Sequence, residues 1–177
     1  MDAVVAMDAA LLAGRTTPDA LARAADAARH WRGASRAARA AALADGRAES
    51  PLETRGRLRI LGSGFVAPRL QVEIRTDGRL IGVVDAWFDD AAVAVEFDGQ
   101  VKYTDPWRDP GRVLWEEKRR EDDLRGLGIR FLRLADEDLG SRWPVAEARL
   151  GRLLAEPGPS DRRFTAAART RGVRRAG

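Results

Sequence analysis

The fold expected for this sequence rests mainly on residues 82–103, GVVDAWFDDAAVAVEFDGQVKY. Two apolar runs are separated by Asp89-Asp90, which predicts two antiparallel strands joined by a tight turn. A lone carboxylate, Asp85, stands inside the first run, and the second run ends in Glu96-Phe97-Asp98-Gly99. A charged side chain among apolar ones costs free energy unless it is paired or binds a cation. The two strands therefore predict a site built on carboxylates.

The register of this hairpin decides whether its carboxylates meet. A two- or four-residue loop centred on Asp89-Asp90 places Asp85 opposite Ala94 and makes Glu96 a diagonal neighbour on the same face. Diagonal neighbours lie about 7–8 Å apart, so the two carboxylates could share one small cation. Asp98 continues that face, because side chains alternate along a strand. A three-residue loop would reverse the parity and separate the carboxylates.

The two faces of the second run differ in the size of their side chains. Ala92 and Ala94 are small and leave room above the sheet on the carboxylate side. Val93, Val95 and Phe97 point the other way, so we expect them to enter a core.

Composition limits the classes of protein and of site. A chain of 177 residues with 45% hydrophobic residues fits one domain with appendages. No apolar run approaches the length of a membrane span, and the N-terminus lacks the basic start of a signal peptide, so we expect a cytoplasmic protein without membrane contact. The chain has no Cys and one His, His30, which argues against thiol chemistry, zinc sites and a serine triad. Any metal must then be bound by oxygen, which favours Mg²⁺ or Mn²⁺.

Basic charge is concentrated at the C-terminal end. Residues 157–177 hold six Arg and one Asp, a net charge of +5, whereas residues 1–156 have a net charge of −1. This composition predicts a disordered basic tail that adds nonspecific affinity for DNA through counterion release. Lys102 and Lys118 are the only lysines among the 31 basic residues. Lys102 is notable because it lies close to the carboxylates in sequence and lysine has a tunable pKa.

Periodicity divides the rest of the chain into helices and strands. Residues 1–47 predict an Ala-rich helical segment with Trp31 as an anchor that packs it on the main domain. Ser50-Pro51-Leu52-Glu53 is a capping box that starts a helix, which gives Glu53 a structural role. The predicted helices cover residues 2–13, 18–30, 34–44, 50–61, 111–127 and 144–155, and strands at 69–76 and 129–134 flank the hairpin.

The run EEKRREDD at residues 116–123 lies in the middle of the helix predicted at 111–127. It contains pairs at the i, i+4 spacing, among them Glu116 and Arg120, which predict a solvated, salt-bridged face. One or two of its basic residues could instead face the site and meet a phosphate.

From residue 50 the predicted order is αβββαβ, an α/β (α+β) domain with a mixed four-stranded sheet over residues 48–156. This order, with an Asp in the second strand and a Glu that ends the third, resembles the restriction-endonuclease-like fold of the PD-(D/E)XK nucleases. More narrowly, residues 48–140 resemble a widespread bacterial family of domains related to very-short-patch-repair endonucleases. Members often lie C-terminal to winged-helix domains of antitoxins in abortive-infection (type IV toxin–antitoxin) systems. The residues that carry the likeness are Ser50-Pro51-Leu52-Glu53, Asp85, Glu96-Phe97-Asp98-Gly99, Lys102-Tyr103, Arg119-Arg120 and Gly128-Ile129-Arg130.

The resemblance implies a role for each matching residue. Asp85, Glu96 and the carbonyl of Phe97 would bind Mg²⁺ or Mn²⁺, and Glu53 would hold a metal-bound water. The lysine of the family signature falls at position 98, where this chain has Asp, and Lys102 is the candidate substitute. The expected catalytic residues are therefore Lys102, Glu53 and Asp98, and the expected nucleic-acid-binding residues are Arg119, Arg120 and Gln100.

Three functions remain open at this level. The first is a metal-dependent endonuclease that hydrolyses DNA phosphodiesters. The second is a catalytically degenerate nuclease fold that binds DNA or protein as a module of an antitoxin-like regulator, and the third is a purely structural remnant. A basic group that reaches the carboxylates would favour the endonuclease over the degenerate binding module. The sequence also leaves open a homodimer or a protein partner.

Overall fold

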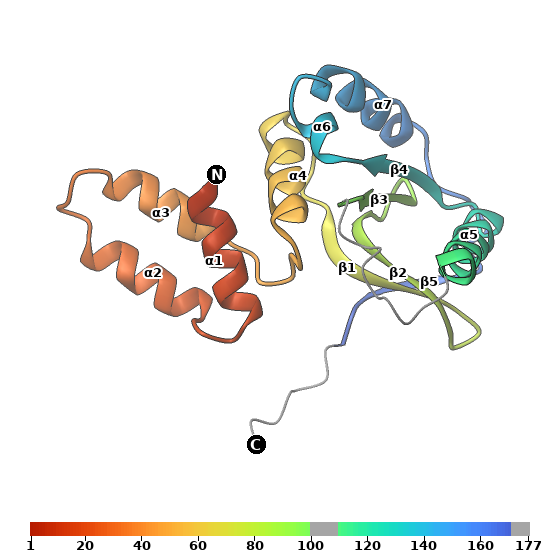
Figure 1. The fold of residues 1–177 in the computed structure, drawn as a ribbon, viewed down its shortest axis with the longest axis horizontal. Coiled ribbons are helices and arrows are strands. Elements are labelled where there is room, and N and C mark those ends of the chain that lie inside the picture. Colours follow the sequence, from red (N-terminus) through yellow and green to blue (C-terminus); the bar gives the residue numbers. More distant parts are fainter. Residues whose placement is uncertain (100–109, 171–177) are drawn as a thin grey trace. The chain divides into compact units, whose positions relative to one another are not determined.

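The computed structural model describes residues 1–99 and 110–170, which form seven helices and five strands (Figure 1). The chain divides into two compact units, Met1–Ala67 and Pro68–Gly177. The expected boundary between residues 47 and 48 differs from this division, because the helix that begins at Pro51 groups with the helices before it.

The first unit consists of four helices. Thr17 caps the second, because its Oγ1 accepts a hydrogen bond from the backbone N–H of Ala20 (3.2 Å). Ser50 caps the fourth in the same way, with the N–H of Glu53 as donor (3.2 Å), and the carboxylate of Glu53 accepts the N–H of Glu49 (2.9 Å). The predicted structural role of Glu53 at the start of this helix is thus confirmed, with Glu49, the residue before the N-cap, as the donor to its carboxylate. The helices are α1 (Asp2–Leu12), α2 (Pro18–Ala27), α3 (Ala34–Leu43) and α4 (Pro51–Gly62).

A buried ion pair holds three parts of the first unit together. The carboxylate of Asp8, on α1, accepts hydrogen bonds from Thr54 Oγ1 (2.8 Å) and Arg57 Nη2 (3.1 Å) of α4. It also accepts the backbone N–H of Asp45, which follows α3 (2.7 Å). The side chains of Asp8 and Arg57 are 2% and 7% exposed. This contact explains why α4 belongs with the N-terminal helices.

Trp31 does not act as the packing anchor that we predicted. Its side chain lies on the turn between α2 and α3 and is 76% exposed. No residue of α2 is buried, and Ala40 is the buried residue of α3. Alanine side chains are too small to enclose a large ring, so the aromatic side chain of this turn stays in solvent.

The second unit is built on a mixed five-stranded sheet in the order β4-β3-β2-β1-β5. Neighbouring strands are antiparallel except β3 and β4, which are parallel. The α5 helix connects these two strands, as a parallel pair requires. The predicted order αβββαβ from residue 50 is confirmed. The elements are β1 (Arg69–Thr76), β2 (Arg79–Phe88), β3 (Val93–Phe97), α5 (Pro110–Gly126), β4 (Arg130–Leu134), α6 (Asp136–Leu139), α7 (Trp143–Ala155) and β5 (Thr165–Ala168).

Helices cover both faces of the sheet. Glu96 and Arg133, which are paired in the β3–β4 register, face α5, because Arg120 of α5 contacts Glu96 and Glu121 of α5 contacts Arg133. Residues alternate along a strand, so Leu132 of β4 faces the other side, where α7 packs against β4. The carboxylate of Glu96 therefore lies beneath a helix rather than on an open surface.

The fifth strand corrects the prediction of a disordered tail that starts at residue 157. Residues 165–168 pair with β1, and Phe164 packs edge-on against the buried Trp87, with ring centroids 5.9 Å apart. Arg162 donates to the carboxylate of Asp89 (3.2 Å). The uncovered edge of β1 supplies the hydrogen-bonding partner that a tail of this composition lacks alone. Residues 171–177 of the predicted tail lie outside the described residues.

Candidate functional site

The hairpin of β2 and β3 brings together the two predicted metal-binding carboxylates. Its strands are antiparallel, with Trp87 opposite Ala94 and Ala86 opposite Val95. Continuing this register by one residue along each strand places Asp85 opposite Glu96. The predicted register, with Asp85 opposite Ala94, is wrong by two residues, because the loop spans residues 89–92 instead of being centred on Asp89-Asp90. The shift is even, so Asp85 and Glu96 stay on one face and become direct instead of diagonal neighbours.

Hydrogen bonds fix the carboxylate of Asp85. Its Oδ2 accepts the backbone N–H of Phe97 (2.9 Å), and its Oδ1 accepts from Gln71 Nε2 at the longer distance of 3.4 Å. Gln71 is buried in β1 with φ at +50°, a conformation uncommon for residues other than glycine. The carbonyl of Gln71 accepts the N–H of Arg169 (2.9 Å), so the end of β5 supports this backbone geometry.

Gln71 was not predicted as a site residue. In the sequence Gln71 stands between the apolar Leu70 and Val72, and this alternation is typical of a residue on the solvent face of a half-buried strand. A single sequence contains no signal for a left-handed residue in the middle of a strand.

Glu96 is a buried carboxylate paired with a guanidinium. Arg120 Nη2 lies 2.8 Å from Oε1 of Glu96, and Arg133 Nη2 lies 3.8 Å from Oε2. Burial raises the pKa of Glu96 above its ordinary value; Arg120 opposes this rise, whereas the charge of Asp85 adds to it. The pKa of Arg120 is raised in turn by Glu96 and then by Glu117, against the opposing effect of its own burial. The two carboxylates and Arg120 form one electrostatic group.

Arg120 reaches Glu96 by crossing the sheet surface over β2. Its Nη1 donates to the carbonyl of Val83 (3.3 Å), and a Cβ at Gly82 would lie 3.1 Å from Cδ of Arg120. This close approach gives Gly82 a structural reason to lack a side chain. The i, i+4 spacing predicted an ion pair between Glu116 and Arg120, but in the structure Glu116 pairs with Arg112 (3.0 Å).

The room that we predicted above Ala92 and Ala94 is filled. Both residues are fully buried in the hydrophobic cluster that includes Trp87 and Leu124. The indole ring occupies the face of the sheet next to the carboxylates, and its Nε1 donates to the carboxylate of Asp89 (2.8 Å). That hydrogen bond is the largest cause that lowers the pKa of Asp89, and Arg162 lowers it further.

The remaining predicted site residues have different positions. Asp98 is exposed just beyond β3, where its N–H donates to the carbonyl of Leu134 (2.9 Å). Arg119 is exposed on α5 and its guanidinium lies 5.3 Å from the ring centroid of Trp115. Glu53 belongs to the first unit, so its role as a holder of a metal-bound water stays a prediction. Lys102 and Gln100 lie outside the described residues.

Within residues 1–99 and 110–170, no group of three or more acidic or histidine side chains has the spacing of a metal site. The candidate centre is therefore a carboxylate pair. A third ligand from the carbonyl of Phe97, which the family resemblance implies, stays a prediction.

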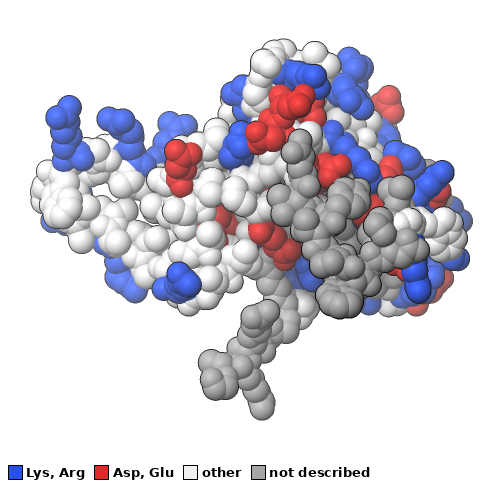
Figure 2. All heavy atoms as spheres, viewed as in Figure 1, with Lys and Arg blue, Asp and Glu red and all other residues white. Residues whose placement is uncertain are grey.

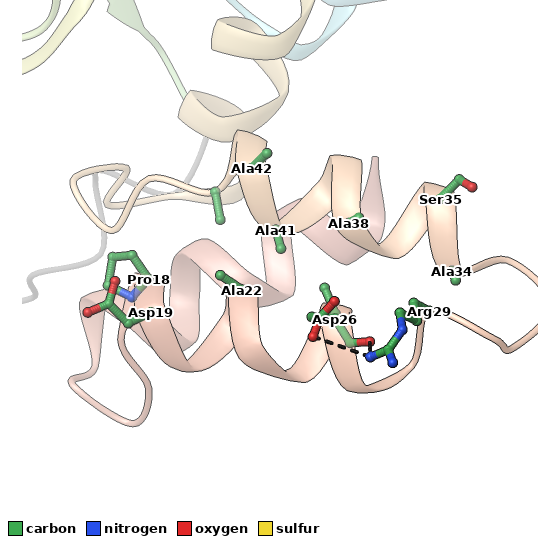
Figure 3. A pocket seen from close by; sticks show the side chains of 12 residues that line it. Pro18, Asp19, Ala22, Asp26, Arg29, Ala34, Ser35, Ala38, Ala41 and Ala42 are labelled. Carbon is green, nitrogen blue, oxygen red and sulfur yellow. Dashed lines mark hydrogen bonds and ion pairs between the residues drawn. The ribbon is translucent and has the colours of Figure 1, made fainter.

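A second feature is a groove of about 640 Å³ between α2 and α3 (Figure 3). Asp26 at its rim pairs with Arg29 (3.5 Å). The groove exists because alanines on facing helices leave space, and its polar groups offer no catalytic arrangement. The lining residues are Pro18, Asp19, Ala22, Ala25, Asp26, Arg29, Ala34, Ser35, Ala38, Ala41, Ala42 and Ala44.

Comparison with known proteins identifies distant relatives. No family model matches the chain, and no solved structure matches it. Two curated proteins of Mycobacterium tuberculosis, from strains CDC 1551 / Oshkosh and ATCC 25618 / H37Rv, are each 28% identical over 152 residues, and both are described as uncharacterized proteins. The alignments cover 86% of this chain and 54% of each relative, so the chain spans about half the length of the curated relatives it matches.

None of the helices in residues 1–99 and 110–170 has both the length and the apolar character to cross a bilayer.

Proposed function

We propose that the second unit is a metal-dependent phosphodiesterase of the PD-(D/E)XK type that acts on DNA. The observation that carries the proposal is the proximity of the two carboxylates: Asp85 accepts the N–H of Phe97, the residue after Glu96, and the guanidinium of Arg120 lies against Glu96. The order αβββαβ and the parallel pairing of β3 with β4 are compatible with that fold.

The donor set of this pair fits Mg²⁺ or Mn²⁺. Both groups are carboxylates, and hard divalent cations prefer oxygen ligands. Each carboxylate has about four lone-pair sites, so the contacts of Asp85 with Phe97 and Gln71 leave acceptor sites free. Asp85 and Glu96 repel each other, which raises the pKa of Glu96, and a cation relieves such repulsion. A metal bound here would supply Lewis-acid stabilisation of a phosphate and a water of lowered pKa.

Arg120 supplies the basic group that the nuclease proposal requires near the carboxylates. It neutralises Glu96 within the folded chain. Its guanidinium also suits a phosphate oxygen, because planar N–H donors match oxyanion geometry. An arginine cannot serve as the tunable amine of the family signature, so Lys102 stays the candidate for that role.

Metal binding is tested first by thermal unfolding with Mn²⁺ and with Mg²⁺. At about five times its dissociation constant a metal stabilises the folded protein by about 1 kcal/mol. We expect a rise in Tm for the wild type and none for Asp85→Asn or Glu96→Gln. Asp122→Asn, which removes an exposed carboxylate from α5, is the matched control and should keep the wild-type response.

Hydrolysis is tested with supercoiled plasmid DNA under the same conditions. Asp85→Asn and Glu96→Gln should abolish nicking, and Lys102→Ala should slow it while leaving the metal-induced rise in Tm intact. Glu53→Gln separates two roles, because glutamine also serves in a capping box. It should keep the wild-type Tm without metal and lower nicking if Glu53 holds a water. The absence of both metal stabilisation and nicking in the wild type would reject the nuclease proposal.

The second candidate is the degenerate module that binds DNA or protein. Two observations favour it: Glu96 already has a cationic partner in Arg120, and Asp98 stands where the signature has Lys. On this candidate the carboxylate pair is structural, and the exposed Arg119 and Trp115 of α5 contact the ligand. Metal-independent DNA binding that Arg119→Ala weakens, without nicking at any metal concentration, would support it over the enzyme.

A further inference from the structure

Trp31 has a large, exposed aromatic side chain on a turn whose backbone is fixed by hydrogen bonds. Its N–H donates to the carbonyl of Ala28 (2.9 Å), and its carbonyl accepts the N–H of Ala34 (3.1 Å). Gly33 between them has φ at +91°, the left-handed conformation that closes the turn into α3. The indole is 76% exposed. A partner would therefore meet a flat apolar surface without first ordering the turn.

A row of arginines continues from this turn along α3. Arg32 precedes the helix, and Arg36 and Arg39 lie within it at the i, i+3 spacing that places side chains on one face. The groove toward α2 is lined by Ala34, Ala38 and Ala41, so this arginine face is the outer face of α3. Figure 2 shows basic side chains that project from the outer edge of this helix.

The three arginines carry charge that the surrounding protein does not neutralise. Each is exposed, and within the described residues none of Arg32, Arg36 and Arg39 forms an ion pair. The sequence has no carboxylate between Asp26 and Asp45. The whole first unit, residues 1–67, holds 10 Arg against 7 Asp and Glu, a net charge of +3, and the second unit accounts for the remaining +1. The outer face of α3 is therefore a local maximum of positive potential.

We propose that the α2–α3 turn and the outer face of α3 bind a single strand of nucleic acid. Arg32, Arg36 and Arg39 contact successive phosphates, and Trp31 stacks on an unpaired base. Aromatic stacking beside a row of cations is how proteins bind single strands without reading their sequence. The site lies wholly in the first unit and needs neither metal nor hydrolysis, so it stands apart from the proposed function.

The same charges could attract an anionic membrane, but the helices lack what a membrane helix needs. An interfacial helix buries Trp, Phe and Leu on its apolar face. Leu43 is the only large apolar residue of α3, and the face opposite the arginines is alanine. A polyanion with exposed bases matches both the arginines and the indole, whereas a bilayer would also need the large apolar helix face that α3 lacks.

The test uses the full chain and a fluorescein-labelled oligothymidine of about 20 nucleotides, longer than common single-strand sites. Binding is followed by fluorescence anisotropy over a salt series with EDTA present, so that hydrolysis cannot contribute. Arg36→Ala/Arg39→Ala should weaken binding and reduce the slope of log K against log salt by about 1.4, since each phosphate contact contributes about 0.7. Trp31→Ala should weaken binding by about five-fold or more. An abasic oligonucleotide should bind wild type and Trp31→Ala equally.

The matched control is Arg149→Ala/Arg152→Ala on α7. These arginines are exposed at the same i, i+3 spacing, and their removal changes the net charge by the same amount. The proposal is overturned if the α3 and α7 double variants have the same salt slope, or if Trp31→Ala binds oligothymidine as the wild type does. It is equally overturned if Arg36→Ala/Arg39→Ala loses binding to phosphatidylserine vesicles but keeps its affinity for the oligonucleotide.

Discussion

Glu96 is a buried carboxylate whose pKa is shifted in opposite directions by two neighbours, Arg120 and Asp85. Arg120 stabilises its charged form, whereas burial and Asp85 favour the protonated form, and the balance raises the pKa of Glu96 above 4.5. An acid whose pKa is higher in the folded than in the unfolded state contributes stability below its unfolded pKa. That stability is lost as the pH rises through the folded pKa.

This sign gives a pH-dependent prediction for Glu96→Gln. The glutamine does not titrate, so the free energy of unfolding of the wild type should fall relative to that of the variant as the pH rises from about 4 through the raised pKa of Glu96. Arg120→Met should move the fall to higher pH, because it removes the group that lowers the pKa. Urea denaturation across this range measures the difference, with Asp122→Asn as the exposed control. If the difference in the free energy of unfolding between the wild type and Glu96→Gln does not change with pH, the prediction is wrong.

The pair of Asp8 and Arg57 predicts a large effect from a single substitution. Asp8→Ala leaves the guanidinium of Arg57 buried without its carboxylate, and breaking a buried pair costs about 3–5 kcal/mol. Asp26→Ala breaks an exposed pair and should change stability by less than about 1 kcal/mol. Chemical denaturation compares the two. Similar effects of both substitutions would show that the buried pair does not hold the first unit together.

At the scale of elements, β5 and the residue before it complete the second unit. β5 covers the edge of β1, and Phe164 covers Trp87 at the centre of the hydrophobic cluster. Because β5 pairs with β1 and Phe164 is part of the hydrophobic cluster, the loss of this segment should destabilise the whole sheet.

We therefore expect removal of residues 162–177 to destabilise the second unit, whereas a disordered tail would leave it unchanged. Phe164→Ala alone should cost about 3–5 kcal/mol, as large aromatic-to-alanine changes in a core do. Val145→Ala on α7 removes an exposed apolar side chain and should have little effect. Thermal and urea unfolding measure all three. A truncated chain as stable as the wild type would assign β5 no role in the core.

At the scale of the molecule, the chain divides into two compact units. Within the first, Asp8 links α1 to α4, and the second contains the hydrophobic cluster around Trp87. Native proteins open locally in such cooperative units, with a free energy of opening for each.

Paired core variants test this separation by amide hydrogen exchange. Asp8→Ala should accelerate exchange in α1 and α4 and leave β1–β4 protected. Phe164→Ala should do the reverse, because its contacts lie in the sheet. Faster exchange throughout the chain in either variant would mean that the two units open as one.

Local patterns in the sequence determined the elements and the caps. The periods of apolar residues predicted the boundaries of β1 and the order αβββαβ, because side-chain spacing follows backbone geometry directly. Ser50 was predictable as a cap, and Thr16 or Thr17 as the cap of the second helix, since a cap depends on residues within one turn. The parity of the hairpin depended on an even number of loop residues, and the loop at residues 89–92 has that parity, although the predicted register was wrong by two residues.

Tertiary structure alone decided which groups neutralise one another and what covers the sheet edge. Arg120 has a local candidate in Glu116, but it pairs with Glu96, where the loss of solvent makes the interaction stronger. Asp8 finds its partner on a distant helix for the same reason. The Ala-rich β5 has little strand propensity of its own, and it is a strand because β1 offers an unpaired edge. Such partners are distant in sequence, so no local pattern specifies them.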